Sequence, residues 1–139
     1  MRAPRSLSGW TMAVFGGLAV LMGVTGLVAP DILLGTLGFS EVPADGAAVD
    51  QAGVLLAASS MASFNMGVYY LLAAAADWRP FFRWTVPFRL LTCTVFTLLV
   101  VVGKAPGAFV TVGLWEGLGA VVTGAALRRE SVAARRAVV

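Results

Sequence analysis

Residues 6–30 of this sequence read SLSGWTMAVFGGLAVLMGVTGLVAP, twenty-five residues without a charge between Arg5 and Asp31. A transmembrane helix needs about 20 apolar residues to cross a hydrocarbon core roughly 30 Å thick. The run is too long for the apolar region of a secretory signal, and Val28-Ala29-Pro30 is a poor cleavage site. The segment is therefore predicted to stay in the protein as a membrane span at about residues 8–29.

Three further apolar runs follow this span. The second, at about residues 51–76, contains twenty-six uncharged residues. The third is interrupted by Arg89, and because Pro87 suits a first helical turn it is predicted at about residues 85–103. The fourth runs from about residue 106 to 127, where two arginines close it. The sequence thus predicts an all-α fold, a four-transmembrane-helix bundle that forms a single integral membrane domain over residues 1–139.

The composition supports a membrane protein. Hydrophobic residues make up 59% of the chain and charged residues 12%, whereas soluble domains average roughly 45–50% and about 25%. This excludes an ordinary soluble globule and a disordered chain. Cys93 is the single cysteine, which excludes a disulfide scaffold, and the absence of histidine excludes a histidine-ligated metal site and a catalytic triad. We expect no metal and no cofactor.

Lysine and arginine placement predicts the orientation. Eight basic residues fall on the side shared by the two termini and the second loop: Arg2, Arg5, Arg79, Arg83, Arg128, Arg129, Arg135 and Arg136. The opposite side has one, Lys104, and an acidic first loop with Asp31, Glu41, Asp45 and Asp50. Both termini are therefore predicted to be cytoplasmic, in a multi-pass protein of the cell membrane. The net charge of +3 then follows from topology and indicates no nucleic-acid partner, although the basic tail also suits contact with anionic lipid.

The segments near the membrane surfaces carry two further patterns. Residues 30–39 are apolar with glycines and predict a short interfacial helix or re-entrant stretch, whereas residues 41–50 are polar and predict a solvated loop. Aromatic residues near the cytoplasmic boundaries indicate an interfacial belt: Trp10, Trp78, Phe81, Phe82 and Trp84.

Glycine patterns predict close helix contacts. Gly113 and Gly117 form a GxxxG motif, and Gly16 and Gly23 lie a heptad apart. Small residues at these spacings let helices approach closely. The motif does not separate packing within one chain from a homo-oligomer or a membrane partner, and packing within the chain is favoured because a four-helix chain must first pack itself.

Glu116 is the most informative polar residue. It lies about 15 Å from the start of the fourth span, near the midplane, and cannot reach the surface. It must face the bundle interior, be protonated or be paired. Intramembrane ionisable residues are functional hypotheses by default, and the alternative is a residue that only fixes helix register.

The second span carries the other deep polar groups. Asn65 is expected at a depth similar to that of Glu116, and Tyr69 follows it by four residues on the same helical face. Ser59, Ser63 and Tyr70 form a second stripe. These groups are expected either to line a cavity or to make interhelical hydrogen bonds.

Arg89 leaves two alternatives open. With a helix start near Thr85 it lies about 6 Å deep and snorkels easily to the headgroups, whereas an ion pair with Glu116 requires it to reach about 9 Å deeper. Thr92 and Cys93 share its helical face. Nearby, Asp77 is expected to pair with Arg79 or Arg83 or to lie in a solvated loop.

Several short stretches resemble a known group of proteins. They are Val28-Ala29-Pro30-Asp31, Asn65-Met66-Gly67-Val68-Tyr69-Tyr70, Arg89 after a basic loop and an acidic residue in the fourth span. Together they resemble the small four-helix bacterial membrane proteins described as DoxX-like or BphX-like. This resemblance implies the four-helix fold and specifies no activity.

Three functions fit these residues. The first is a membrane protein with a polar intramembrane pocket that binds a lipophilic small molecule. The second is a cofactor-independent membrane enzyme, a cyclase, isomerase or epoxide-opening enzyme, with Glu116 as general acid or base. The third is a proton-coupled exporter, because small multidrug transporters also carry a buried glutamate beside aromatic residues, here Trp115. The candidate catalytic residues are Glu116, Asn65 and Arg89, and the candidate binding residues are Tyr69, Tyr70, Ser63, Thr92 and Trp115.

Overall fold

The computed structural model describes residues 3–39 and 51–137, and every regular element in that part of the chain is helical. The elements in order are α1 (Leu7–Val28), α2 (Pro30–Thr36), α3 (Gln51–Ala75), α4 (Arg79–Val101), the 3-10 turn η1 (Gly107–Phe109) and α5 (Val110–Arg136). Four of them, α1, α3, α4 and the combined η1–α5, are long and apolar enough to cross a membrane. The predicted number of helices able to cross a membrane is confirmed for the described residues.

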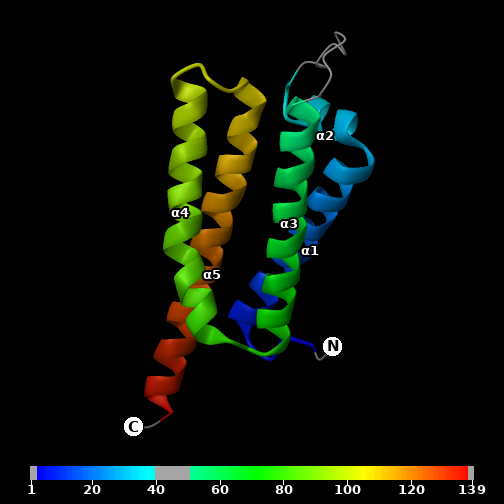
Figure 1. Cartoon of the computed structure of the whole chain (residues 1–139). Coiled ribbons are helices and arrows are strands. Elements are labelled where there is room, and N and C mark those ends of the chain that lie inside the picture. Colours follow the sequence, from blue (N-terminus) through cyan, green and yellow to red (C-terminus); the bar gives the residue numbers. More distant parts are fainter. Residues whose placement is uncertain (1–2, 40–50, 138–139) are drawn as a thin grey trace.

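The helices run antiparallel, so that both termini lie at one end of the bundle (Figure 1). The turn between α3 and α4 lies at the same end, which we call the terminal end, and the turn between α4 and α5 lies at the other. α1 packs mainly along α3, and α4 packs mainly along α5. The two pairs meet through contacts of α1 with α5 and α4.

The first two spans agree with the predicted ranges to within one residue. The short helix predicted after the first span is confirmed as α2. Pro30 is its first residue, and the missing proline N–H costs nothing at that position. The acidic residues Glu41, Asp45 and Asp50 of the first loop lie outside the described residues.

The third span corrects the prediction. α4 begins at Arg79, six residues before the predicted start near Thr85, and Pro87 lies inside the helix. Pro80 takes the first-turn position that the sequence analysis gave to Pro87. An interior proline removes one backbone hydrogen bond but is tolerated in membrane helices. The earlier start places Arg89 about 15 Å along the helix instead of about 6 Å.

The fourth span also extends further than predicted. α5 continues to Arg136, nine residues past the predicted end at Leu127. Charged residues end a membrane span but do not end a helix, and arginines in a last turn interact favourably with the helix dipole. Figure 1 shows this extension projecting beyond the other helices at the terminal end.

Glycines bring α1 and α3 into close contact. A Cβ added at Gly67 of α3 would lie 2.6 Å from the carbonyl oxygen of Gly16, and one added at Gly23 would lie 2.6 Å from the backbone nitrogen of Phe64. Gly113 and Gly117 of α5 face α4, where an added Cβ would lie 3.1 Å from Thr97 Oγ1 and 2.8 Å from Cys93 Sγ. The glycine motifs therefore serve packing within the chain.

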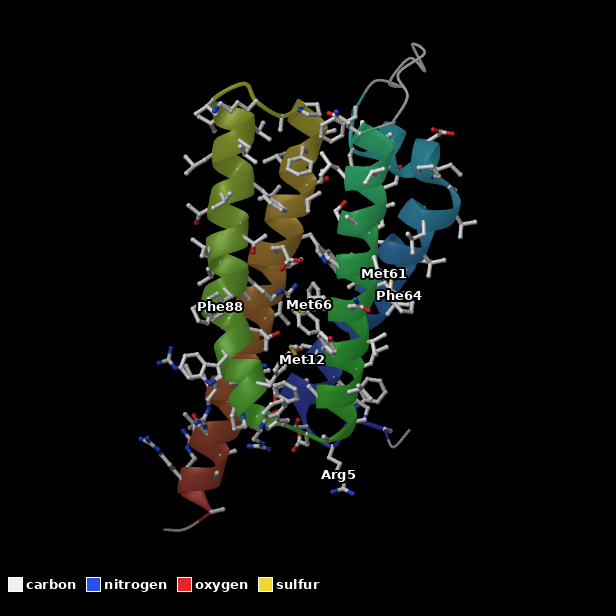
Figure 2. The ribbon with its side chains drawn as sticks, in the orientation of Figure 1. Arg5, Met12, Met61, Phe64, Met66 and Phe88 are labelled. Carbon is white, nitrogen blue, oxygen red and sulfur yellow. The ribbon has the colours of Figure 1, made fainter. Side chains whose placement is uncertain are left out.

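The buried core lies toward the terminal end. It contains Met12, Phe15, Tyr70, Ala73, Ala74 and Phe82. Figure 2 shows Met12 between the two helix pairs, whereas Phe88 lies on the outer side of α4. Phe82 was predicted to belong to the interfacial belt, but it is fully buried. Trp10, Trp78 and Trp84 are exposed, as a belt requires.

Candidate functional site

The two charged residues inside the spans form an ion pair. Arg89 Nε of α4 donates to Glu116 Oε2 of α5 at 2.8 Å. Arg89 is only 3% exposed, and the Glu116 side chain is 25% exposed. Of the two alternatives for Arg89, the structure therefore shows pairing and not snorkelling. The longer α4 is the reason, because it brings Arg89 to the depth of Glu116.

The guanidinium of Arg89 lies where four helices meet. Its Cζ is 4.1 Å from the ring centroid of Phe15 on α1 and 5.9 Å from that of Tyr70 on α3. On α5, a Cβ added at Gly119 would lie 2.0 Å from Arg89 Nη2, so only glycine leaves room for the guanidinium. Contact with aromatic faces is favourable for a desolvated cation. The site is thus a buried cation held by one carboxylate and two rings.

One buried nitrogen of this cation, Arg89 Nη1, has no hydrogen-bond partner among the described residues. A buried donor left unpaired costs about 1–3 kcal/mol, and native structures leave few of them. The site therefore has a free donor to offer to an acceptor such as a carbonyl or carboxylate oxygen.

An open apolar groove lies on the surface of α5 next to α4. Its volume is about 500 Å³, and it is lined by Cys93, Thr111, Leu114, Trp115, Gly117 and Leu118. Trp115 and Gly117 flank Glu116 in the chain, and Cys93 lies one helical turn beyond Arg89. The ring of Trp115 also packs on Phe15, with centroids 4.4 Å apart. Residues next to Glu116 in the chain and one turn from Arg89 therefore line the groove, whereas Arg89 and Glu116 themselves do not.

The structure brings together part of the predicted site. Arg89, Glu116 and Tyr70 meet in the interior, and Trp115 lines the groove. Ser63 donates to the carbonyl of Ala19 at 3.0 Å and so links α3 to α1. The hydroxyl of Thr92 donates to the carbonyl of Phe88 in its own helix at 3.0 Å.

Asn65 and Tyr69 do not reach the ion pair. Both are exposed, Tyr69 at 55%, which corrects the expectation that they line an interior cavity or make interhelical hydrogen bonds. The rotation of α3 is the cause. Gly67 must face α1, and at about 100° per residue Asn65 and Tyr69 fall on the opposite side of the helix from it. Tyr70, three residues from Gly67, lies on the buried side.

A second polar cluster at the terminal end was missed. Glu130 of α5 accepts from the backbone N–H and the hydroxyl of Ser8, both at 2.9 Å. Arg79 lies between Glu130 and Asp77, at 3.7 and 3.6 Å, so of the alternatives for Asp77 the structure shows the pair with Arg79. Ser6 caps α1 and also donates to Asp77.

Part of this cluster was readable from the sequence. A serine directly before an apolar run is a helix N-cap signal and marks Ser6. Glu130 gave no signal, because the fourth span was predicted to end before it. Phe15 and Gly119 also gave none, since an aromatic residue and a glycine in an apolar span are ordinary packing residues.

Within residues 3–39 and 51–137 no group of three or more His, Cys, Asp or Glu side chains is placed to hold a metal ion. Comparisons with protein-family models, with curated proteins and with solved structures gave no significant match. The resemblance to DoxX-like and BphX-like membrane proteins therefore stays a prediction. Function must be argued from the ion pair and the groove.

Proposed function

We propose that this chain is a membrane protein that binds a lipophilic small molecule carrying a hydrogen-bond acceptor. The molecule lies in the apolar groove, and its acceptor binds the buried guanidinium of Arg89. Both termini are in the cytoplasm, because seven basic residues among the described part of the chain lie in the segments at the terminal end and one, Lys104, lies at the other.

The unpartnered Nη1 of Arg89 carries this proposal. Glu116 uses only the Nε donor, although an arginine has five N–H donors. A small-molecule site is typically apolar with a few polar groups that orient the ligand. The groove supplies the apolar part, and a quarter of the Glu116 side chain is exposed.

The enzyme and exporter hypotheses both require Glu116 to exchange protons with a substrate or with water. In the structure the carboxylate of Glu116 is instead held by Arg89. No feature of the described residues favours either hypothesis over binding.

Fluorescence of Trp115 tests the proposal directly, because this ring lines the groove. Trp10, Trp78 and Trp84 are replaced by phenylalanine, and the protein is placed in phosphatidylcholine nanodiscs. A brominated fatty acid, which carries acceptor oxygens, is compared with a brominated alkane of equal length, which carries none. We expect saturable quenching by the acid at a concentration at least about tenfold below that of the alkane, since one charge-assisted hydrogen bond is worth about 1.5–3 kcal/mol.

The matched variants separate binding from folding. The double variant Arg89→Met with Glu116→Leu removes the whole pair and is expected to fold, since apolar residues often replace a buried ion pair without loss. It should quench equally with acid and alkane. Asn65→Leu, at an exposed position on α3, should keep the preference for the acid. Equal quenching by acid and alkane in the parent protein would refute the proposal.

A further inference from the structure

The last turns of α5 carry four arginines on one side of the helix. They are Arg128, Arg129, Arg135 and Arg136, and we call them the arginine face. At about 100° per residue they fall within an arc of about 120°, with Val132 near its middle. All four side chains are exposed. The sequence spacing alone gives this grouping once the helix is known to continue to Arg136.

The opposite side of the same segment is attached to the bundle. Glu130 accepts two hydrogen bonds from Ser8 at the start of α1 and lies 3.7 Å from Arg79. Glu130 lies about 160° around the helix from Val132. These contacts fix the rotation of α5 at this level, so the arginine face must point away from the bundle.

The arginine face lies outside the hydrocarbon layer. The 27 residues of α5 measure about 40 Å, which exceeds the roughly 30 Å of a hydrocarbon core. Figure 1 shows the end of α5 extending past the other helices, and Figure 2 shows side chains with terminal nitrogens projecting from it. A helix continuous with a membrane span holds these charges at the headgroup level without a flexible linker.

We propose that the arginine face binds the phosphates of anionic phospholipids in the leaflet at the terminal end. The guanidinium group matches phosphate with two parallel hydrogen bonds, and the face itself contains no carboxylate, because Glu130 is on the other side. Its position next to the bilayer favours lipid over a soluble partner. This inference is independent of the ligand proposed for Arg89.

An environment-sensitive fluorophore on the face tests the inference. Cys93→Ser removes the native thiol, and Val132→Cys places the label in the middle of the arginine face. The protein is reconstituted in vesicles of phosphatidylcholine alone or of equal parts phosphatidylcholine and phosphatidylglycerol. We expect a blue shift only with phosphatidylglycerol, which disappears at about 1 M salt, where the screening length is about 3 Å. A label at Ala134→Cys, on the side away from the face, should stay in water in both vesicles.

Charge variants identify the residues. Arg135→Gln with Arg136→Gln should lower the ratio of headgroup-bound to free label by roughly 10- to 30-fold, since each arginine near an anionic surface contributes about fivefold. Arg5→Gln with Arg83→Gln removes the same charge at the terminal end but off the face, and should leave the ratio unchanged. The four substituted arginines are all exposed, and Arg5 lies next to the N-cap residue of α1. Thermal unfolding verifies that each variant is folded.

Three outcomes would overturn the inference. One is an emission wavelength of the label at Val132→Cys that is the same in the two kinds of vesicle. Another is an equal effect of the two charge variants, which would assign the attraction to net charge. The third is loss of the shift when an oligonucleotide or polyglutamate is added at a concentration far below that of the anionic lipid, which would assign the face to a soluble macromolecule.

Discussion

Removing both members of the Arg89–Glu116 pair should harm the protein less than removing Glu116 alone. In Glu116→Leu the guanidinium loses its only hydrogen-bond acceptor among the described residues while it stays 3% exposed. An arginine cannot shed its charge inside a protein. Breaking a buried pair from one side costs about 3–5 kcal/mol, and we expect the free energy of unfolding to fall by that amount.

The partner variant should be milder. In Arg89→Met the remaining carboxyl is a quarter exposed, so we expect a loss of about 1–3 kcal/mol, the cost of an unsatisfied buried group. The double variant leaves no charge in the interior. It loses the contact between the guanidinium and Phe15, worth about 0.5–2 kcal/mol, and should lie within about 2 kcal/mol of the parent.

The measurement is a double-mutant cycle on the free energy of unfolding. Unfolding is monitored by circular dichroism in mixed micelles. The expected coupling energy between the two positions is at least about 2 kcal/mol, above the roughly 0.5 kcal/mol seen for independent sites. A coupling energy below about 0.5 kcal/mol, or a Glu116→Leu variant as stable as the parent, would show that the pair does not stabilise the bundle.

Four further substitutions test the packing and the terminal end. Gly67→Ala should lower the free energy of unfolding by about 1–3 kcal/mol, because its Cβ would meet the α1 backbone at 2.6 Å. Gly17→Ala, with nothing within 4 Å of the added Cβ, should raise it by about 0.5–1 kcal/mol. An equal effect of the two alanines in the same unfolding assay would contradict the contact between α3 and α1. Glu130→Gln should cost about 1 kcal/mol and speed amide hydrogen exchange at Ser8, since it weakens the carboxylate cap of α1, and unchanged exchange there would argue against that cap. Asn65→Leu should leave thermal stability unchanged or raised, and a marked loss would place Asn65 back in the interior.

Four long runs of apolar residues in the sequence determined the architecture of this protein. Whether a segment enters a membrane depends on the summed apolarity of about 20 consecutive residues, and that sum is a local property. The same property predicted Glu116 near the midplane, because both ends of its span were marked by turns and charges. Sequence also gave the small-residue contacts of Gly16 and Gly113, since only small residues let helix backbones approach closely.

Helix ends were harder to predict than spans. The sequence placed the start of the third span too late, because Pro80 and Pro87 both satisfy the local rule for a first helical turn. It placed the end of the fourth span too early, because leaving the hydrocarbon layer is not the same as leaving the helix. These two errors hid the depth of Arg89 and the cap that Glu130 provides for α1.

The meeting of side chains was decided only by the tertiary structure. A helix of given sequence can turn any face toward its neighbours, and the close contact of Gly67 with α1 chose the rotation that buries Tyr70 and exposes Asn65. The packing of the helices also brings Arg89 of α4 into contact with Glu116 of α5 and Phe15 of α1. Apolarity is a sum along the chain, whereas an ion pair depends on the rotation and depth of two helices at once.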